Sequence, residues 1–480
     1  MRSFKSEVAL IKHEVLKHIV RLLFDDKLEE EINRLPRTLT NMGLTHYRCC
    51  VYKERAVLAE RVKFALGFSP KEVDEEERLG QIVRDRLKDH EIKLPVLDII
   101  EIACDRCPID KYLVTDACRG CVAHYCVNAC PKKAITIVGR RAYIDQEHCV
   151  ECGRCSKACK FHAIVEVSRP CERSCPADAI KPGPKRNSVI HQDMCTSCGT
   201  CTTACPFGAI TDKSQIYQVV NWLKQGTKVI AAVAPAIAGQ FGPKVKMGQI
   251  FSALIKVGFA KVAEVALGAD EVAKLEAEEF KHLVEDKKWV ASSCCPAFVS
   301  IIKKHFPEFE DHIAQTPSPM VVLGRRLKRE LPDYKVVFIG PCIAKKEEAM
   351  AQDSGIDAVL TFEELDAIFD ARDINFTDLS EIPSSFECAT SKGRGFAVSG
   401  GVAEAVNRVL EEGGLSGLLK PVRANGLEEC KKLLSLARAG KLEGNFLEGM
   451  ACEGGCVGGP ATLVEAQKSA KAVENYKMTC

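Results

Sequence analysis

The feature that most constrains this chain is the crowding of its cysteines into one stretch. Of its 26 cysteines, sixteen lie between Cys104 and Cys205 and only Cys49 and Cys50 precede them, whereas eight are spread over the last 275 residues. In an oxidising compartment so many thiols would indicate disulfides, but in a reducing one they indicate metal binding or catalysis. The choice between the two depends on where the protein resides.

The expected compartment is the cytoplasm. The N-terminal sequence alternates charged and apolar residues at helical spacing, and it lacks the apolar core and small-residue cleavage site of a secretory signal. No stretch approaches the ~20 apolar residues of a membrane-spanning helix, and a formal net charge of +2 gives no basic field for nucleic acid. We therefore expect a cytoplasmic protein without a membrane span or a nucleic-acid partner, whose cysteines bind metal.

The 480 residues are enough for two or three domains, and the cysteine distribution divides them into residues 1–100, 101–213 and 214–480. The first part has apolar residues at three- and four-residue intervals, which predicts a helical region, and "SPKEVDEEERLGQIVRDRLKDH" has the Ser-Pro start of a helix. Its motifs indicate no function. Cys49 and Cys50 could form a ligand or redox site, but partly buried thiols are the simpler interpretation.

The second part carries a ferredoxin-like pattern. "CTSCGTCTTACP" has the C-x2-C-x2-C-x3-C-P spacing of bacterial ferredoxins, in which three cysteines hold one [4Fe–4S] cube and the fourth reaches its neighbour. "CVECGRCSKACK" repeats the spacing with Lys160 in place of proline, and "CRGCVAHYCVNACP" is a variant with two added residues. The last two motifs predict one two-cluster unit, with one cube on Cys118, Cys121, Cys126 and Cys159 and the other on Cys149, Cys152, Cys155 and Cys130.

Four further cysteines predict a second unit that encloses the first. "CDRC" supplies the front half of a motif and "CERSCP" supplies the back half. With the first unit inserted between these halves, an outer unit would hold one cube on Cys104, Cys107, Cys171 and Cys205 and the other on Cys195, Cys198, Cys201 and Cys175. The alternative is a zinc site on Cys104, Cys107, Cys118 and Cys121, but it leaves other cysteines without a partner pattern.

Sixteen cysteines thus predict an α+β, ferredoxin-like relay of up to four [4Fe–4S] clusters. Clusters with thiolate ligands pass single electrons at low potential. Such a relay implies an electron carrier outside the protein and redox chemistry inside it, which the third part must supply.

The third part has an α/β pattern, in which strand-like apolar runs alternate with helices. Three of its loops carry cysteines beside proline or glycine, namely "SSCCPA", "GPCIAKKE" and "MACEGGCVGGP". They contain enough thiols for one more cube, on Cys295, Cys342, Cys452 and Cys456. Glycine permits the backbone to approach such a group closely. The alternative is buried small hydrophobic residues, which we expect of Cys388 and Cys430.

These three loops resemble the signature loops of [FeFe]-hydrogenases, in a region that runs from about residue 215 to the C-terminus. "VAPA", "TFEEL" and "SGGVAEA" are similar to other stretches of that family. Ala297 and Glu453 stand where the best-studied branch has a glycine and a proline, and in this respect the loops resemble the group B branch, which carries "CCPA". The resemblance implies an α/β catalytic domain of two lobes, in which mixed sheets flanked by helices surround a buried cluster.

By this resemblance the third part binds an H-cluster, which is a [4Fe–4S] cube bridged to a two-iron unit that carries CO, cyanide and azadithiolate. The implied ligands of the cube are Cys295, Cys342, Cys452 and Cys456, with Cys456 as the bridge. Lys345 resembles the lysine that pairs with a cyanide, and Pro235 and Met450 match the apolar wall. The alternative for Lys345 is a surface helix lysine, which is the preferred interpretation of Lys346.

The resemblance also implies a route for protons. Cys294 matches the proton-transferring thiol of the family, and Glu276 and Glu279 match the glutamates that follow it. Ala314 and Leu283 stand where the family has a serine and an arginine, and neither side chain can relay a proton. Either water fills these gaps or the exit differs, and the alternative interpretation of the two glutamates is that they are solvated helix residues.

We therefore expect an anaerobic, cytoplasmic ferredoxin hydrogenase that interconverts H2 with protons and electrons and exchanges electrons with ferredoxin or a similar carrier. Dedicated maturation proteins would supply the two-iron unit. Three alternatives remain open, namely a hydrogen sensor with low turnover, an iron–sulfur assembly protein, and an electron-transfer subunit without catalysis.

Overall fold

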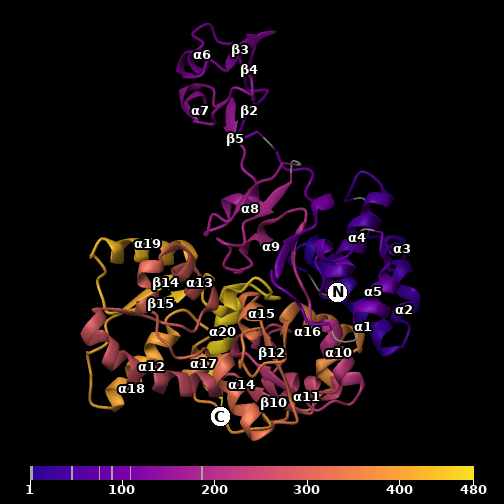
Figure 1. Cartoon of the computed structure of the whole chain (residues 1–480), viewed down its shortest axis with the longest axis vertical. Helices are drawn as coiled ribbons and strands as arrows, with labels where there is room; N and C mark the ends of the chain where they lie inside the picture. The colour runs from indigo at the N-terminus through magenta and orange to yellow at the C-terminus, as the bar shows by residue number, and fades with distance from the viewer. Residues whose placement is uncertain are drawn as a thin grey trace.

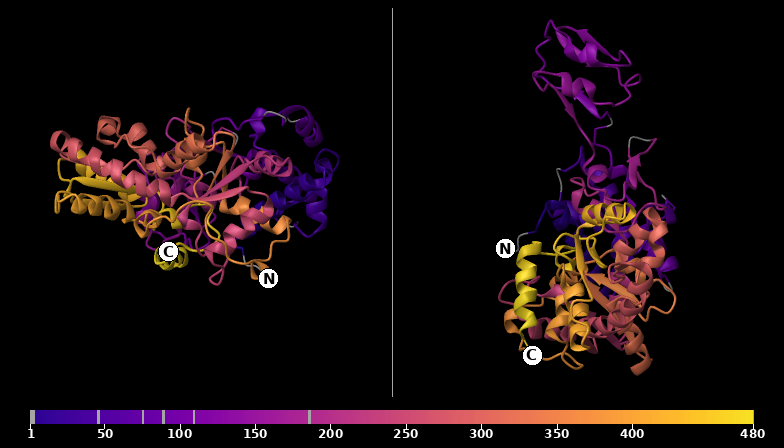
Figure 2. Two further views of the ribbon diagram at one scale, coloured as in Figure 1. Left: turned by 90° about the horizontal axis from the view of Figure 1, so that it is seen from below. Right: turned by 90° about the vertical axis from the view of Figure 1, so that its left-hand side faces the viewer.

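The computed structural model describes residues 4–44, 47–74, 76–87, 90–108, 110–184 and 187–479. Figure 1 shows an N-terminal group of helices, a slender stack of small cysteine-rich units, and a large α/β part that forms most of the body. The far end of the stack stands clear of every other element in the right-hand view of Figure 2. The described part of the chain contains no helix that is long and apolar enough to cross a membrane.

The N-terminal part is helical, as expected. Its elements are α1 Glu7–Phe24, α2 Leu28–Glu31, η1 Ile32–Arg34, α3 Leu35–Asn41, α4 Val51–Ala65, η2 Pro70–Glu72 and α5 Leu79–Arg86. The helix expected to start at Ser69 is only the 3-10 turn η2, because Val73 leaves the helical region at φ −129° and buries its side chain. Cys49 and Cys50 are exposed, so the expectation of partly buried thiols is wrong.

Helix α1 joins this part to the catalytic part. Its apolar face includes Leu16 and Ile19, which share one hydrophobic core with Leu365 and Ile368 of α16 (Phe362–Ala371). Burial of apolar side chains is the main favourable contribution to such packing. The N-terminal helices are therefore fixed on the body.

The cysteine-rich stack is built from two nested units. The inner unit contains β2 Tyr112–Val114, α6 Tyr125–Ala129, β3 Ile135–Val138, β4 Arg141–Ile144, α7 Arg154–Ala158 and β5 Ile164–Glu166. Strand β2 pairs with β5, and β3 pairs with β4, both antiparallel. The inner unit therefore closes on itself.

The outer unit is assembled from segments on both sides of the inner one. It contains β1 Leu97–Ile99, η3 Glu101–Ala103, α8 Pro170–Arg173, β6 Ile180–Pro182, β7 Ser188–Ile190, α9 Thr200–Ala204 and β8 Ile210–Asp212. Strand β1 pairs antiparallel with β8, and β6 with β7. The pairing of β1 with β8 brings the start of the stack back to its end, which is the nesting that the sequence predicts.

The α/β part contains two sheets. One has the strand order β10-β9-β12-β13, from β9 Val229–Val233, β10 Lys261–Glu264, β12 Lys335–Gly340 and β13 Ala358–Thr361. The other has the order β11-β15-β14, from β11 Val290–Ala291, β14 Pro421–Asn425 and β15 Phe446–Met450. All their pairings are parallel, so the expectation of mixed sheets is wrong. Long connections that contain helices return each strand in the same direction.

Helices cover these sheets and connect their strands. They are α10 Ile216–Lys224, α11 Met247–Val257, α12 Ala266–Lys287, α13 Pro296–His305, α14 Pro319–Glu330, α15 Ala344–Ala349, α17 Ser391–Gly395, α18 Gly401–Glu412, α19 Leu427–Arg438 and α20 Ala466–Lys477. Short 3-10 turns are η4 Pro235–Ile237, η5 Pro307–His312, η6 Phe376–Asp378 and η7 Cys456–Gly458. Strand β9 is buried along its whole length, which accounts for its apolar sequence.

The carboxyl ends of four parallel strands point to the same interior region. Pro235 follows β9, Cys342 follows β12, Cys295 follows β11 and Cys452 follows β15. Ligand sites in parallel α/β folds form beyond the carboxyl ends of the strands. The fold thus brings together residues that lie far apart in the sequence.

Candidate active site

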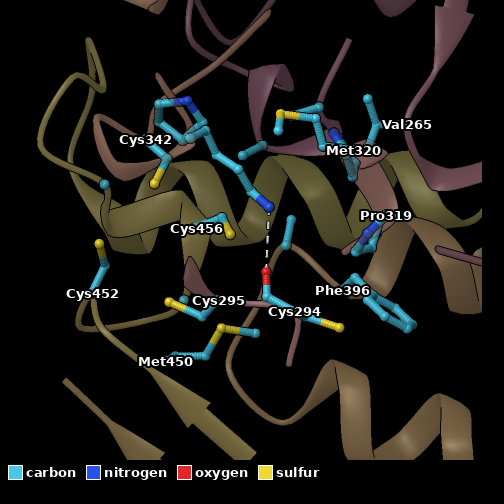
Figure 3. A pocket seen from close by; sticks show the side chains of 18 of the residues that line it. Val265, Cys294, Cys295, Pro319, Met320, Cys342, Phe396, Met450, Cys452 and Cys456 are labelled. Carbon is cyan, nitrogen blue, oxygen red and sulfur yellow. Dashed lines mark hydrogen bonds between the residues drawn. The ribbon is translucent and has the colours of Figure 1, made fainter. Parts of the chain in front are cut away.

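Four cysteines from three loops surround one cavity (Figure 3). The side chains of Cys295, Cys342, Cys452 and Cys456 line it, and in the close-up their sulfur atoms face a common space. The rest of the wall is largely apolar and includes Pro235, Ala266, Met320, Phe396 and Met450. The structure therefore brings together all four predicted cube ligands and both predicted wall residues.

Local backbone features place these thiols. Pro296 is the first residue of α13, a position that suits its fixed φ angle, and Cys295 precedes the helix as its cap. Gly455 has φ +93°, and a Cβ atom there would lie 2.6 Å from the backbone nitrogen of Ser399. Any other residue would strain this turn and push Cys456 out of place. The glycines of "EGG" are therefore a structural requirement of the loop.

The cavity changes the acidity of its thiols. Burial, and then repulsion from Cys295 and Cys456, raises the pKa of Cys342 to about 12. Burial likewise raises the pKa of Cys456 to about 11 and that of Cys452 well above its usual value. Thiols with raised pKa values that share one cavity keep their protons until a cationic metal group binds and displaces them. This donor set suits an iron–sulfur cluster.

Lys345 brings one positive charge to the cavity. Its Nζ donates to Ser318 Oγ at 2.8 Å and to the carbonyl oxygen of Cys294 at 3.4 Å, and it pairs with Glu348 Oε2 at 2.5 Å. Burial acts to lower the pKa of Lys345, but Glu348 and the nearby thiols hold it above its usual value. The side chain is only 8% exposed, so it is not a surface lysine. It can oppose an anion inside the cavity.

Lys346 differs from its expected surface position. It is fully buried, and its Nζ pairs with Asp212 at 2.7 Å and with Glu364 at 2.9 Å. Lys12 of α1 pairs with the same Asp212 at 2.7 Å. The interpretation as a surface lysine is wrong because the fold brings carboxylates from β8 and α16 to the start of α15. These ion pairs connect all three parts of the chain.

Cys294 lies beside a buried glutamate. Its Sγ is 3.8 Å from Glu276 Oε2, and burial raises the pKa of Cys294 well above its usual value. Glu276 is 1% exposed, so the interpretation as a solvated helix residue is wrong for it. Burial, with repulsion from Glu279 and Glu448, raises the pKa of Glu276 to about 8. A carboxyl group with such a pKa can both accept and release a proton near neutral pH.

Glu279 lies closer to the surface and has a partner that the sequence did not predict. Its Oε2 accepts hydrogen bonds from the hydroxyl of Thr316 at 2.7 Å and from the backbone N–H of Thr316 at 3.0 Å. Ala314 and Leu283 belong to the hydrophobic core around α12. The only sequence signal for this hydroxyl was the run "QTPSP" that follows Ala314.

The relay cysteines gather in fours. One small cavity is lined by Cys118, Cys121, Cys126 and Cys159, and another by Cys175, Cys195, Cys198 and Cys201. Burial raises the pKa of Cys107 to about 11, and repulsion from the nearby thiols of Cys104, Cys171 and Cys205 adds to this. Burial raises the pKa of Cys155, as does repulsion from Cys149 and Cys130. Cys104 and Cys118 belong to different cores, so the structure does not assemble the zinc set.

The groups lie in sequence toward the cavity. Burial and the thiols of its own group raise the pKa of Cys201 most. Cys171, from the neighbouring group of the outer unit, lies close enough to add to this effect. Cys198 lines both its own small cavity and the large one. The stack thus leads from the outside to the four cavity thiols.

Two further cysteines of the catalytic part, both within residues 187–479 that the structure describes, differ from each other. Cys430 is fully buried, as expected, and its Sγ contacts the carbonyl oxygen of Met450 at 3.8 Å. Cys388 is exposed and disulfide-bonded, so the expectation of a buried small residue is wrong for it. Neither lines the cavity.

Sequence families match each part of this arrangement. Residues 227–460 match the family described as iron only hydrogenase large subunit, C-terminal domain. Residues 117–163 match a 4Fe-4S dicluster domain, and residues 165–216 match the LdpA Fe-S cluster-binding domain. The last two ranges correspond to the inner unit and to much of the outer unit of the stack.

Individual proteins are similar to parts of this chain. Iron hydrogenase 1 of Clostridium pasteurianum is 30% identical over 368 residues, which cover 66% of this chain and 64% of that protein. A variant of the apo [FeFe]-hydrogenase of Chlamydomonas reinhardtii overlaps with a TM-score of 0.44 at 24% identity, over 52% of this chain and 84% of that one. A cytosolic Fe-S cluster assembly factor of Botryotinia fuckeliana is 27% identical over 157 residues, which cover 28% of this chain and 26% of that protein.

One relative is matched over most of its length. The periplasmic [Fe] hydrogenase large subunit of Nitratidesulfovibrio vulgaris is 32% identical over 372 residues, which cover 66% of this chain and 85% of that protein. The family match over residues 227–460 includes the region that forms the cavity. This chain therefore belongs to the iron-only hydrogenase family.

Proposed function

We propose that this protein is a [FeFe]-hydrogenase that catalyses the reversible conversion of H2 into two protons and two electrons. The observation that carries the proposal is the cavity in which four thiols meet beside the buried ammonium group of Lys345. A fifth thiol, that of Cys294, lines the same cavity and is hydrogen-bonded to Glu276. A plain electron-transfer subunit would need neither the ammonium group nor the fifth thiol. Ala297 and Glu453, which stand where the best-studied branch has a glycine and a proline, favour the group B branch.

The residues of the cavity fit an H-cluster. Cys295, Cys342, Cys452 and Cys456 would hold a [4Fe–4S] cube, with Cys456 as the bridge to a two-iron unit. When bound, that unit supplies the cleavage and formation of H2. Lys345 would oppose an anionic cyanide ligand, since an unpaired buried charge is costly, and the apolar wall with Pro235 and Met450 would exclude water.

Protons would reach or leave the cavity through Cys294. The thiol can exchange a proton with Glu276, whose carboxylate oxygen lies 3.8 Å from the sulfur. The side chain of Ser293, the neighbour of Cys294, donates to the carbonyl oxygen of Thr316 at 2.5 Å. The hydroxyl of Thr316 donates to Glu279 and would stand in for the group that Ala314 lacks. A water molecule would bridge from there to Glu276, because a backbone carbonyl cannot relay the proton.

Electrons would travel along the stack through four [4Fe–4S] clusters. The supporting observation is that two of the four predicted sets each line one small cavity, with Cys198 also at the wall of the active-site cavity. A ferredoxin-type carrier in the cytoplasm would exchange electrons with the outer end, and maturation proteins would deliver the two-iron unit. The domain limits would be residues 1–100, 101–213 and 214–480.

The partial match to a cytosolic assembly factor supports a second candidate, a non-catalytic iron–sulfur protein. A hydrogen sensor of low turnover is a third, since it would need the same cavity. Infrared spectroscopy of the matured protein separates these functions. Bands of CO and cyanide with rapid H2-dependent reduction of a dye are expected of the enzyme, and the same bands with very slow reduction indicate a sensor. Absence of the bands would overturn the hydrogenase proposal.

A further inference from the structure

The inner unit of the stack exposes an unusual number of apolar side chains. Of the eighteen large hydrophobic residues that are exposed in the described chain, six lie between β2 and β5, namely Val122, Tyr125, Val138, Tyr143, Val150 and Phe161. Val122 is 96% exposed. A concentration of exposed apolar surface on a small unit marks an interaction site.

One cysteine group lies at the far end of this unit. Cys126 is on α6, and the Sγ of Cys118 accepts a hydrogen bond from the backbone N–H of Ala142 in β4 at 3.5 Å. Helix α6 and strands β3 and β4 form the end of the stack that is farthest from the body (Figure 1). The other group of the inner unit includes Cys152 and Cys155. Burial and Glu166 raise the pKa of Tyr112 in β2, and the thiols of Cys155 and Cys152 add to this because they lie near its ring. This second group therefore lies beside β2, which is nearer the body.

Three of the apolar side chains flank the far cysteine group. Phe161 lines the same small cavity as its four thiols, Val122 directly follows Cys121, and Tyr125 directly precedes Cys126. The ammonium group of Lys160 lies 6.0 Å from the centre of the Tyr125 ring. We call Val122, Tyr125, Phe161, Arg119 and Lys160 the tip surface.

The tip surface lies on a positively charged unit. Residues 112–166 contain eight Lys and Arg against five Asp and Glu, a net charge of +3, while the whole chain carries only +2. Asp116 pairs with Arg141, Asp145 with His148 and Glu166 with Lys111. Arg119 and Lys160 are exposed and form no ion pair with any residue that the structure describes. The uncompensated charge at the tip is therefore positive.

We propose that the tip surface docks a small acidic protein that carries one electron at a time. This inference rests on the proposed hydrogenase function, for which it identifies the place and charge of the partner. An apolar centre excludes water over the outermost cluster, and a positive rim steers an acidic partner. Transient redox interfaces are small, typically under ~1,200 Å², so the few side chains of the tip surface can form the centre of one. Two copies of this chain would repel each other at such a surface.

The test measures H2 evolution by the matured protein with two donors. One donor is a reduced acidic ferredoxin with two [4Fe–4S] clusters, and the other is reduced methyl viologen. For the double variant Arg119→Glu, Lys160→Glu we expect the KM for ferredoxin to rise ~10-fold at low ionic strength, with kcat and the methyl viologen rate within about twofold of the unmodified protein. Added salt should raise the KM of the unmodified protein and have little effect on that of the variant.

Two further variants keep the test decisive. Val122→Asn removes apolar contact at a side chain that touches almost nothing in its own chain, so folding and iron content should not change while the KM for ferredoxin rises. Lys244→Glu changes an exposed lysine in the loop before α11, at the opposite end of the molecule, and should leave the KM unchanged. An unchanged KM in both tip variants, or an equal rise in Lys244→Glu, would overturn the proposal.

The outcome also separates this inference from the proposed function. If the unmodified, matured protein evolves no H2 even with methyl viologen, the hydrogenase function fails. Docking is then measured directly as salt-dependent binding of the same ferredoxin in a calorimeter, where the double variant should bind more weakly. A dimer in solution that both tip variants dissociate would overturn the docking proposal and assign the surface to a second copy of the chain.

Discussion

Two groups of four cysteines offer the same thiol ligands in opposite surroundings. Cys118 and the other thiols of its group lie at the end of a projecting stack, next to a valine that is 96% exposed. Cys295 and the other cavity thiols lie inside the body, within an apolar wall and beside one buried lysine. The difference teaches that the surroundings determine what a cluster can do, because the first group can meet another protein and the second can exclude water.

The two groups also differ in how the chain builds them. Three of the four tip cysteines come from one run of nine residues, Cys118 to Cys126, whereas the cavity cysteines follow three strands that are far apart in the sequence. The tip site therefore depends mainly on local structure. The cavity depends on the whole fold, including the buried ion pairs that join α1, β8 and α15.

The largest effect is expected from Cys294→Ala. Removal of a positioned proton-transfer group typically costs about 10²–10⁴-fold in rate, so H2 turnover should fall in that range. The cluster ligands stay intact, so the CO and cyanide bands should be retained. Cys430→Ala removes another buried thiol outside the cavity and is the matched control, with turnover close to that of the unmodified protein. Full turnover in Cys294→Ala would exclude this thiol from the proton route.

Lys346→Met tests whether the cavity depends on the whole fold. The change leaves Glu364 and Asp212 buried with fewer partners, and loss of one member of a buried ion pair typically costs about 3–5 kcal/mol. We expect a large drop in the thermal midpoint. The infrared bands of the cavity should disappear at a lower temperature than the electron paramagnetic resonance signal of the tip cluster.

The control for this variant is Lys335→Met, which breaks an ion pair with Asp357 at 2.9 Å in which the lysine is 43% exposed. Surface pairs contribute about 0–1 kcal/mol, so the midpoint should move little. Equal shifts in the two variants would contradict a special role of the buried pairs. Loss of both spectroscopic signals at one temperature would contradict the independence of the tip.

The attachment of α1 should depend on pH through His13. Its ring lies 3.2 Å from Asp366 and 2.9 Å from Asp370, and although burial opposes the charge, these carboxylates raise the pKa of His13 to about 8. The contribution of His13 to the free energy of unfolding is fully present below its unfolded pKa of ~6.5. It is lost as the pH rises through the folded pKa, which lowers the free energy of unfolding by about 2 kcal/mol at most. Unfolding midpoints measured from about pH 6 to about pH 9 would show this decrease, and His13→Gln should flatten it. A decrease of the same size in that variant would assign it to another group.

Much of the relay could be predicted because its ligands are local. The spacing "CxxCxxCxxxC" indicates which thiols can share a group. The two half-motifs predicted an outer unit with segments on both sides of the inner one, and in the structure β1 pairs with β8 across the inserted inner unit. The α/β pattern was equally readable, since strands such as β9 are continuous apolar runs. The relative direction of the strands could not be predicted, because it depends on long connections that no local pattern encodes.

Burial of polar residues was the feature that the sequence predicted least well. The sequence "AKKEEA" predicts that Lys346 lies at the surface. Its burial is favourable only because its ammonium group forms ion pairs with Asp212 and Glu364. Glu276 shows the same limit, because its burial follows from the packing of α12 against α14 and α18. Such contacts join residues more than a hundred positions apart, as Asp212 and Lys346 are, and spacing cannot reveal them.

Thr316 gives the smallest effect and the sharpest test of the proton route. Its hydroxyl donates to Glu279 at 2.7 Å, and Thr316→Val removes that hydroxyl while keeping the shape of the side chain. We expect H2 turnover to fall ~10-fold, less than the about 10²–10⁴-fold of a group that transfers the proton itself, because the hydroxyl only assists Glu279. The solvent isotope effect should increase, and the CO and cyanide bands should be unchanged. Thr316→Ser restores the hydroxyl and should recover most of the rate. If valine and serine behave alike, the hydroxyl is not part of the route, and water beside Glu279 must carry the proton between the buried Glu276 and the surface.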